Sequence, residues 1–177
     1  MGSIEIRRLT GEDALLLQQI GKKTFEQTFS SSNSKENMEK YLEEGFSLTK
    51  LQAEIDDLNA EFYFAIHHNH IIGYLKLNIG QSQTSIKNDN ALEIERIYVL
   101  KEFHGQNIGQ QLFEKAVERA FSQKVDFIWL GVWEENKRAI QFYTKNGFVA
   151  FDKHIFKLGD EEQTDIMMKW EIPHSMI

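Results

Sequence analysis

The chain contains no cysteine, only one proline and no long hydrophobic run, and each of these absences removes a class of function. Without cysteine there is no disulfide framework, no thiolate metal site and no cysteine nucleophile. No apolar run is long enough to span a bilayer, and the N-terminal segment lacks the apolar core of a secretion signal. We therefore expect a protein of the cytoplasm.

Basic residues are outnumbered as well: 20 Lys and Arg side chains stand against 27 Asp and Glu side chains, which gives a formal net charge of −7. Nucleic acids and anionic membranes usually attract basic surfaces, so we expect neither as a partner. An acidic balance suits a small cationic substrate better. The aromatic content is compatible with a homodimer, although nothing in the sequence locates its interface.

The length of 177 residues fits one domain with a sizeable core. We find no repeat and no internal linker, so we expect a single domain over residues 1–172 and a tail over 173–177. Hydrophobic periodicity and turn residues predict the following order of elements: a strand at 4–9, helices at 14–29, 35–44 and 48–58, a hairpin at 62–79, a strand at 93–99, a helix after 109, a strand at 127–132, a helix at 136–146, and a hairpin at 148–170. This order predicts an α/β fold with a mixed sheet in a single layer and helices on both faces.

The segment LEIERIYVLKEFHGQNIGQQ, residues 92–111, is the most informative part of the chain. It reads as a strand, a glycine-containing turn and the start of a helix. The first N–H groups of a helix have no partner within the helix, and the helix dipole is positive there, so such a turn suits a phosphate group. The same pattern also occurs in purely structural strand-to-helix units, so the turn alone does not decide between the two interpretations.

A second block, NKRAIQFYTKNGF at residues 136–148, favours the phosphate-binding interpretation of the turn. The two blocks together resemble the GNAT acyltransferase superfamily, whose turn has an Arg or Gln followed by Gly-x-Gly/Ala-x-Gly. The chain departs from this pattern twice, because His104 replaces the Arg or Gln and Asn107 replaces the middle small residue. Asn tolerates a left-handed backbone better than most residues, so the loop can still form.

The resemblance implies a GNAT fold, with a mixed and mostly antiparallel sheet and a central splayed strand pair. It also implies acetyl-CoA as the acyl donor. Main-chain groups of the strand, the loop and the second block would hold the donor, which gives these expected contact residues: Ile97, Tyr98, Val99, His104, Gly105, Gln106, Asn107, Ile108, Gly109, Gln110, Asn136 and Lys145. Because no cysteine is available for an acyl-enzyme, we expect direct acetyl transfer to an amine.

Two side chains are expected to carry the proton transfers. An ammonium group must lose a proton before it attacks a thioester, and Glu95 matches the position of a candidate base in polyamine-acetylating members of the superfamily. Glu93 lies two residues away and therefore on the same face of the strand. Tyr143 is the expected acid that eases departure of the thiolate. The alternative interpretations are a strand carboxylate that pairs with Arg96, and a core tyrosine.

A closer resemblance, to the PaiA-type spermidine/spermine N-acetyltransferases, rests on TFEQTF, NSKENMEKYL and IFKLGDEEQTDIMMKW. It implies a polyamine as the acceptor. Phe25, Phe29 and Trp133 are then expected to line the acceptor channel, and Glu134 to hold a distal ammonium. Phe25 and Phe29 are spaced by one helical turn, so a role in the hydrophobic core is the alternative.

Two other functions stay open from the sequence. The acceptor could be another amine, such as an amino acid, an aminoglycoside or a protein amine. The chain could also be a non-catalytic CoA-binding or regulatory module. We expect no metal site, because the histidines at 67, 68 and 70 lie at a hairpin tip without an acidic residue to complete a ligand set.

Overall fold

A computed structural model describes residues 3–173 of the chain. The tail expected at residues 173–177 lies, apart from Pro173, outside the described residues. The strands are β1 (Glu5–Arg8), β2 (Ala60–His67), β3 (His70–Ile79), β4 (Ala91–Val99), β5 (Phe127–Trp133), β6 (Val149–Leu158) and β7 (Glu161–Glu171). The α-helices are α1 (Ala14–Phe29), α2 (Lys35–Gly45), α3 (Leu48–Asp56), α4 (Ile108–Gln123) and α5 (Lys137–Lys145). Within residues 3–173 no helix is both long and apolar enough to cross a membrane.

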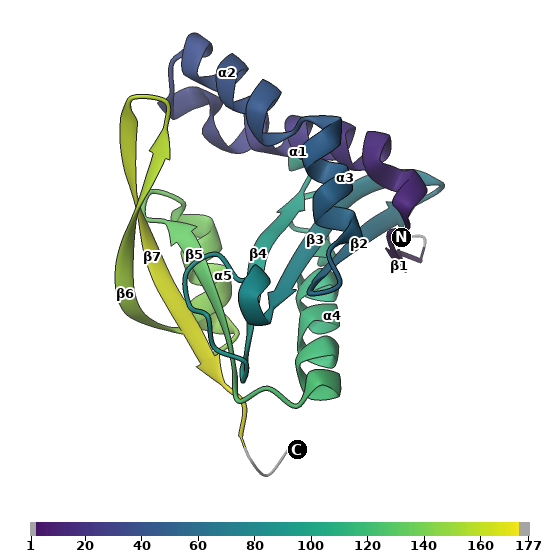
Figure 1. Cartoon of the computed structure of the whole chain (residues 1–177), viewed down its shortest axis with the longest axis vertical. Helices are drawn as coiled ribbons and strands as arrows, with labels where there is room; N and C mark the ends of the chain where they lie inside the picture. Colours follow the sequence, from purple (N-terminus) through teal and green to yellow (C-terminus); the bar gives the residue numbers. More distant parts are fainter. Residues whose placement is uncertain (1–2, 174–177) are drawn as a thin grey trace.

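The seven strands form one sheet in the order β1-β2-β3-β4-β5-β7-β6 (Figure 1). All neighbouring strands are antiparallel except β4 and β5, which are parallel. The predicted mixed and mostly antiparallel sheet is therefore confirmed. Parallel neighbours need a crossover connection, and α4 supplies it here.

The parallel pair separates soon after it forms. β4 pairs with β5 only from Ala91–Glu93 to Phe127–Trp129, although both strands continue beyond these residues. The register between β3 and β4 shifts at Lys76 and Leu77, which leaves Glu95 as the extra residue of a β-bulge. A bulge bends its strand and redirects the side chains around it. The splayed pair expected from the sequence is thus present, with Glu95 at the bend.

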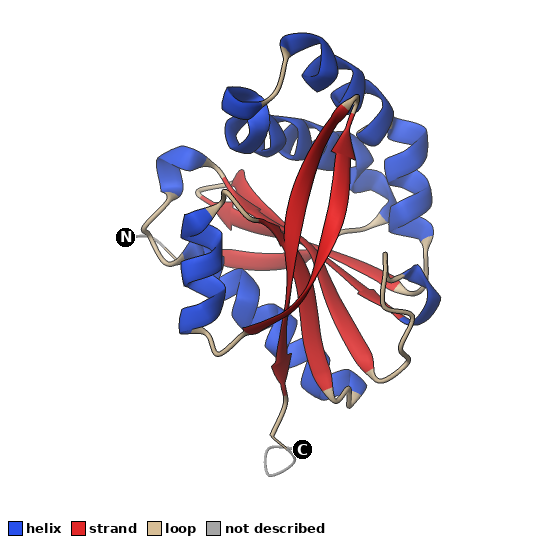
Figure 2. Ribbon diagram, turned by 90° about the vertical axis from the view of Figure 1, so that its left-hand side faces the viewer, coloured by secondary structure: helices blue, strands red, loops and turns tan. Residues whose placement is uncertain are grey.

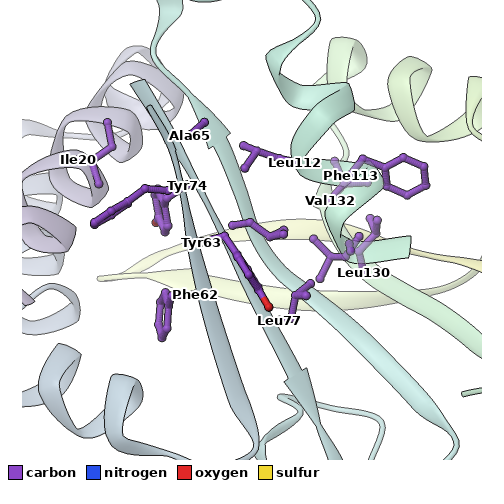
Figure 3. Close-up of a cluster of buried hydrophobic side chains, with 14 of the residues drawn as sticks. Ile20, Phe62, Tyr63, Ala65, Tyr74, Leu77, Leu112, Phe113, Leu130 and Val132 are labelled. Atoms are coloured by element: carbon purple, nitrogen blue, oxygen red, sulfur yellow. The ribbon is translucent and has the colours of Figure 1, made fainter. Parts of the chain in front are cut away.

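Helices cover both faces of the sheet. α4 packs against β3 and β4 on one face, while α1 and α3 pack against β3 and β2 on the other. In Figure 3, Leu112 and Phe113 of α4 lie on one side of the strands, and Ile20 of α1 and Phe62 lie on the opposite side. Because both faces are covered, β3 is buried at consecutive residues from Ile72 to Asn78 rather than at alternate ones, and Lys76 and Asn78 are polar side chains within this buried stretch.

The β6–β7 hairpin reaches across to the end of the helical layer (Figure 2). At its tip, Asp160 accepts a hydrogen bond of 2.8 Å from the Asn37 side chain of α2. Gln163 donates to the Asn33 side chain at 3.1 Å. The hairpin therefore closes one side of the space above the splayed strands.

Several predicted boundaries are confirmed and a few are corrected. The helix predicted at 14–29 is present as α1, preceded by a capping box in which Thr10 donates its backbone N–H to Asp13 at 2.8 Å, and Gly147 ends α5 with a φ of 93°. The helix predicted to reach residue 58 ends at Asp56, because the Asp57 side chain accepts the N–H of Asn59 at 2.8 Å and turns the chain. A 3₁₀ turn at Lys101–Phe103 was not predicted.

Candidate active site

A cavity of about 540 Å³ occupies the gap where β4 and β5 separate. β3 and β4 form one wall, β5 and the β6–β7 hairpin form the opposite wall, and α1, α2 and α3 close the space between them. Of the expected site residues, the cavity is lined by Glu93, Glu95, Ile97, Tyr98, Phe25, Phe29, Trp133, Asn136 and Tyr143.

The two expected carboxylates meet at one amide. The Asn78 side chain donates to Glu93 at 3.0 Å and to Glu95 at 2.6 Å. Asn78 is 1% exposed, and its single side-chain NH2 group serves both carboxylates, so it joins them as a pair. The expectation that both face the same side of the strand holds in the structure.

Glu95 is also the partner of two buried cations. Its carboxylate lies 2.6 Å from the Lys76 ammonium and 3.3 Å from the Arg96 guanidinium. Glu54 of α3 contacts the same cations, each at 3.1 Å, so the four charges balance. Burial alone would raise the pKa of Glu95, but Arg96 and Lys76 outweigh it and hold that pKa below its ordinary value. Glu95 is therefore ionised at neutral pH.

The pKa of Glu93 is shifted in the opposite direction. It is 3% exposed and accepts hydrogen bonds from the backbone N–H of Thr84, at 2.8 Å, and from the Thr84 hydroxyl. Burial outweighs these contacts and raises the pKa of Glu93. The loop that carries Thr84 is fixed by fully buried Gln83, which accepts from the Trp129 indole at 2.7 Å. Neighbouring carboxylates with pKa values displaced in opposite directions are typical of proton-transfer sites.

Aromatic rings form the side of the cavity next to the helices. The Phe25 ring stacks on Tyr41 with centroids 4.4 Å apart, and the Phe29 ring lies 5.5 Å from Trp133 and 6.5 Å from Phe156. Phe25 and Phe29 are 5% and 7% exposed. They therefore belong to the hydrophobic core and also present ring surface to the cavity, so the two interpretations of the sequence are compatible.

Asp165 is a cavity carboxylate that sequence reasoning missed. It lies on β7, beside His154 of β6 and next to Gly131 of β5. Within residues 3–173 its carboxylate has no hydrogen-bond or ion-pair partner. Burial raises the pKa of Asp165, and His154 opposes this shift. Its position in a generic polar strand gave no sequence signal, because only the hairpin packing turns it toward the cavity.

Glu134, which was expected to hold a distal ammonium, does not line this cavity. It lies outside the cavity, in a neighbouring depression of about 420 Å³ that also contains Glu135, Glu161 and Glu162. Trp133 lines both spaces. The structure therefore brings Trp133 to the cavity, whereas Glu134 lies in the depression on the other side of that indole.

Tyr143 projects from α5 into the cavity and is 6% exposed. Its ring packs on Phe148 at 5.6 Å, and within the described residues its hydroxyl has no hydrogen-bond partner. Burial raises the pKa of Tyr143, so the phenol keeps its proton at neutral pH. Asn136 caps the same helix, where its side-chain oxygen accepts the N–H of Ala139 at 3.2 Å.

The expected donor-binding edge of β4 is open toward the gap. Leu100 donates its N–H to Ile72 of β3 at 2.8 Å, and backbone groups alternate in direction along a strand. The backbone groups of Ile97 and Val99 therefore point toward the splay. The Val99 carbonyl accepts from the His104 ring at 2.8 Å, which leaves the Val99 N–H and the backbone of Ile97 for a ligand.

The turn before α4 has the geometry of an anion site. Gly105 and Asn107 have positive φ values of 78° and 64°, which confirms that Asn can form this loop. A Cβ atom added at Gly109 would meet no protein atom within 4 Å, so protein packing does not require glycine there. Open space at the N-terminus of this helix suits the phosphate groups of CoA. A side chain at position 109 would extend into that space.

The remaining expected contact residues lie around this turn. Ile108 is buried beneath it, and the Gln106 side chain donates to the Glu102 carbonyl at 3.3 Å. Gln110 donates to the Asn146 side chain at 3.0 Å, which joins the first turn of α4 to the end of α5. Lys145 is exposed in the last turn of α5, beside that contact.

A splayed strand edge, an open helix N-terminus and a cavity with paired carboxylates and a phenol define an acyltransferase that uses a CoA thioester. The chain matches the model of the Acetyltransferase (GNAT) family over residues 23–148, and it belongs to that family. It is therefore an acetyl-CoA-dependent N-acetyltransferase.

Relatives support this assignment along nearly the whole chain. An uncharacterized N-acetyltransferase in the pepI 3′ region of Lactobacillus delbrueckii subsp. lactis is 39% identical over 169 residues, which cover 96% of this chain and 98% of that protein. The spermidine N(1)-acetyltransferase of Thermoplasma acidophilum is 28% identical over 171 residues, covering 94% and 96%. The crystal structure of PaiA N-acetyltransferase from Thermoplasma acidophilum in complex with coenzyme A has a TM-score of 0.81 and 27% identity, covering 97% of this chain and 100% of that chain.

Proposed function

We propose that the acceptor is a polyamine such as spermidine or spermine, acetylated on a primary amine in the cytoplasm. The observation that carries this proposal is the carboxylate of Asp165, which lines a cavity with an aromatic side and has no hydrogen-bond or ion-pair partner among residues 3–173. A partly buried carboxylate without a partner is unfavourable, and an ammonium group removes that cost. The relation to a spermidine N(1)-acetyltransferase supports the same acceptor class.

The cavity offers different environments to the two ends of a polyamine. The wall with Glu54, Lys76, Glu95 and Arg96 is balanced in charge and does not strongly favour a cation. The opposite wall, with Asp165, is acidic. The reacting nitrogen must become neutral before it attacks, whereas a distal nitrogen can stay protonated. We therefore place the reacting amine near Glu95 and the distal ammonium near Asp165.

The proton transfers follow from the same arrangement. Bound acetyl-CoA supplies an acetyl thioester, and transfer forms a carbon–nitrogen bond while the carbon–sulfur bond breaks. In our proposal Glu95 contacts the amine, and the amine proton passes directly or through water to the Glu93–Glu95 pair. Glu93 has the higher pKa of the two, so the proton is more stable on it. Tyr143 donates its phenolic proton to the departing thiolate.

Replacing Asp165 by Asn tests the acceptor class. We expect the KM for spermidine to rise about tenfold or more, which corresponds to loss of a charge-assisted hydrogen bond worth about 1.5 kcal/mol. The KM for butylamine, which has no distal ammonium, should stay within about twofold of the wild-type value. Steady-state kinetics with both amines measure this difference. Asn removes an unpartnered carboxylate, so we expect no loss of thermal stability.

Asp152→Asn is the matched control, because Asp152 is exposed on β6 and its carboxylate contacts only the Lys153 backbone among the described residues. This variant should change neither the KM for spermidine nor the KM for butylamine. An equal effect of Asp165→Asn on spermidine and butylamine would contradict the proposed role, and so would unchanged kinetics with both amines.

A further inference from the structure

Arg138 and His104 form a contact whose direction can be assigned. Arg138 lies in the first turn of α5, and its guanidinium Nη1 is hydrogen-bonded to Nδ1 of His104. A guanidinium group can only donate hydrogen bonds, so Nδ1 must accept. Nε2 then carries the ring hydrogen and donates it to the Val99 carbonyl at 2.8 Å. Both ring nitrogens are engaged, and the imidazole is neutral.

This contact holds a cation in place without neutralising it. The Arg138 side chain is exposed, and within residues 3–173 no carboxylate oxygen lies within 4.0 Å of its guanidinium. Burial, together with the positive charges of Arg138 and Lys101, lowers the pKa of His104, while the Val99 carbonyl and Glu102 oppose that shift. Glu102 itself pairs with Lys23 at 3.2 Å. The charge of Arg138 thus remains available to a ligand.

The position of this cation relates it to the donor site. α5 lies along the whole turn, because its first turn contacts His104 and the residue after its last turn, Asn146, contacts Gln110. Between these two contacts lie the positive-φ residues Gly105 and Asn107 and the start of α4. The guanidinium therefore lies beside His104, directly before the turn that carries these backbone N–H groups. Planar guanidinium groups bind phosphate oxygens in pairs, which a single lysine cannot do.

We propose that Arg138 binds the pyrophosphate of acetyl-CoA and that His104 is its positioning residue. The turn of this chain has a histidine where the superfamily pattern has Arg or Gln, so the turn itself offers no side-chain cation at that position. Arg138 enters from the next helix and supplies the charge, while His104 fixes the guanidinium through Nδ1. This inference rests on the acetyl-CoA dependence of the enzyme and not on the identity of the amine.

Three acetyl donors test this proposal in the Arg138→Gln variant: acetyl-CoA, acetyl-3′-dephospho-CoA and S-acetylpantetheine, which lacks all phosphates. We expect kcat/KM to fall about tenfold or more with both donors that carry a pyrophosphate, as expected for the loss of a charge-assisted phosphate contact. With S-acetylpantetheine the variant and the wild-type enzyme should be equal within about twofold. His104→Ala should show the same donor dependence with a smaller effect.

Lys137→Gln is the matched control, because Lys137 is the adjacent cation and its ammonium donates to the Glu134 carbonyl at 2.6 Å. It should not show the donor dependence. Equal losses with all three donors would mean that Arg138 only maintains the fold, and unchanged kinetics with all three would remove it from the site. A loss with acetyl-CoA alone would assign Arg138 to the 3′-phosphate. Each of these three results would overturn the proposal.

Discussion

Tyr143→Phe is expected to lower kcat by about 10²-fold or more, because it removes the proposed proton donor to the departing thiolate. The dissociation constant for acetyl-CoA should stay within about twofold, since the ring and its packing on Phe148 are retained. The hydroxyl has no hydrogen-bond partner in the described part of the chain, so its removal leaves no buried group unsatisfied. Single-turnover kinetics and calorimetric titration with acetyl-CoA separate the two quantities.

Tyr63→Phe is the control for this prediction. Tyr63 lies outside the cavity and donates its hydroxyl hydrogen to Glu61 at 2.7 Å, so its loss should reduce stability without changing kcat. If Tyr143→Phe turns over at the wild-type rate, Tyr143 is a packing residue and the thiolate receives its proton from another source.

Glu95→Gln is expected to lower kcat/KM for the amine by about 10²-fold or more while acetyl-CoA affinity is retained. Gln keeps the shape of the side chain but cannot take up the amine proton or pass it on within the Glu93–Glu95 pair. Lys76 and Arg96 keep Glu54 as a partner at 3.1 Å, so we expect the variant to fold with a loss of about 1–3 kcal/mol in the free energy of unfolding. Steady-state kinetics and urea denaturation measure the two effects.

The pH dependence of kcat distinguishes the roles of the two carboxylates. A base is active when deprotonated, so activity falls as the pH drops through its pKa. Because burial raises the pKa of Glu93 and ion pairs lower that of Glu95, the acid limb of the wild-type profile should lie above the usual glutamate range. Glu93→Gln should remove this limb, and Glu95→Gln should keep it at a reduced rate.

Glu61→Gln provides the matched control for Glu95→Gln. Glu61 is also partly buried in an ion pair, with Arg119 at 2.8 Å, but it lies outside the cavity. It should lose stability and keep its turnover. A Glu95→Gln enzyme with wild-type kcat/KM would contradict the assignment of Glu95 to the amine.

Local patterns in the sequence were sufficient for most of the fold. Alternation and helical spacing predicted the strands and helices, including the helix at 14–29, whose bounds match those of α1. The splayed strand pair and the mostly antiparallel strand directions were predicted from the resemblance of two short blocks to a superfamily. No local pattern could supply them, because strand order depends on contacts between distant segments.

The site was predicted where its chemistry lies in those blocks and missed where it depends on packing. Glu93, Glu95 and Tyr143 lie within the two blocks, and all three line the cavity. Asp165 reaches the cavity only because the last hairpin folds across the sheet. The balanced charges around Glu95 depend on Glu54, which lies in α3 and is distant in sequence from β3 and β4.

Release of free thiol from acetyl-CoA, measured across a panel of amines, tests the central claim most directly. The panel contains spermidine, spermine, an amino acid, an aminoglycoside and a basic peptide. We predict saturable release with spermidine and spermine, at far lower KM than with the other amines. Saturable release with a different amine alone would contradict the polyamine assignment. Binding of acetyl-CoA without acetylation of any amine would contradict the catalytic account and favour a CoA-binding module.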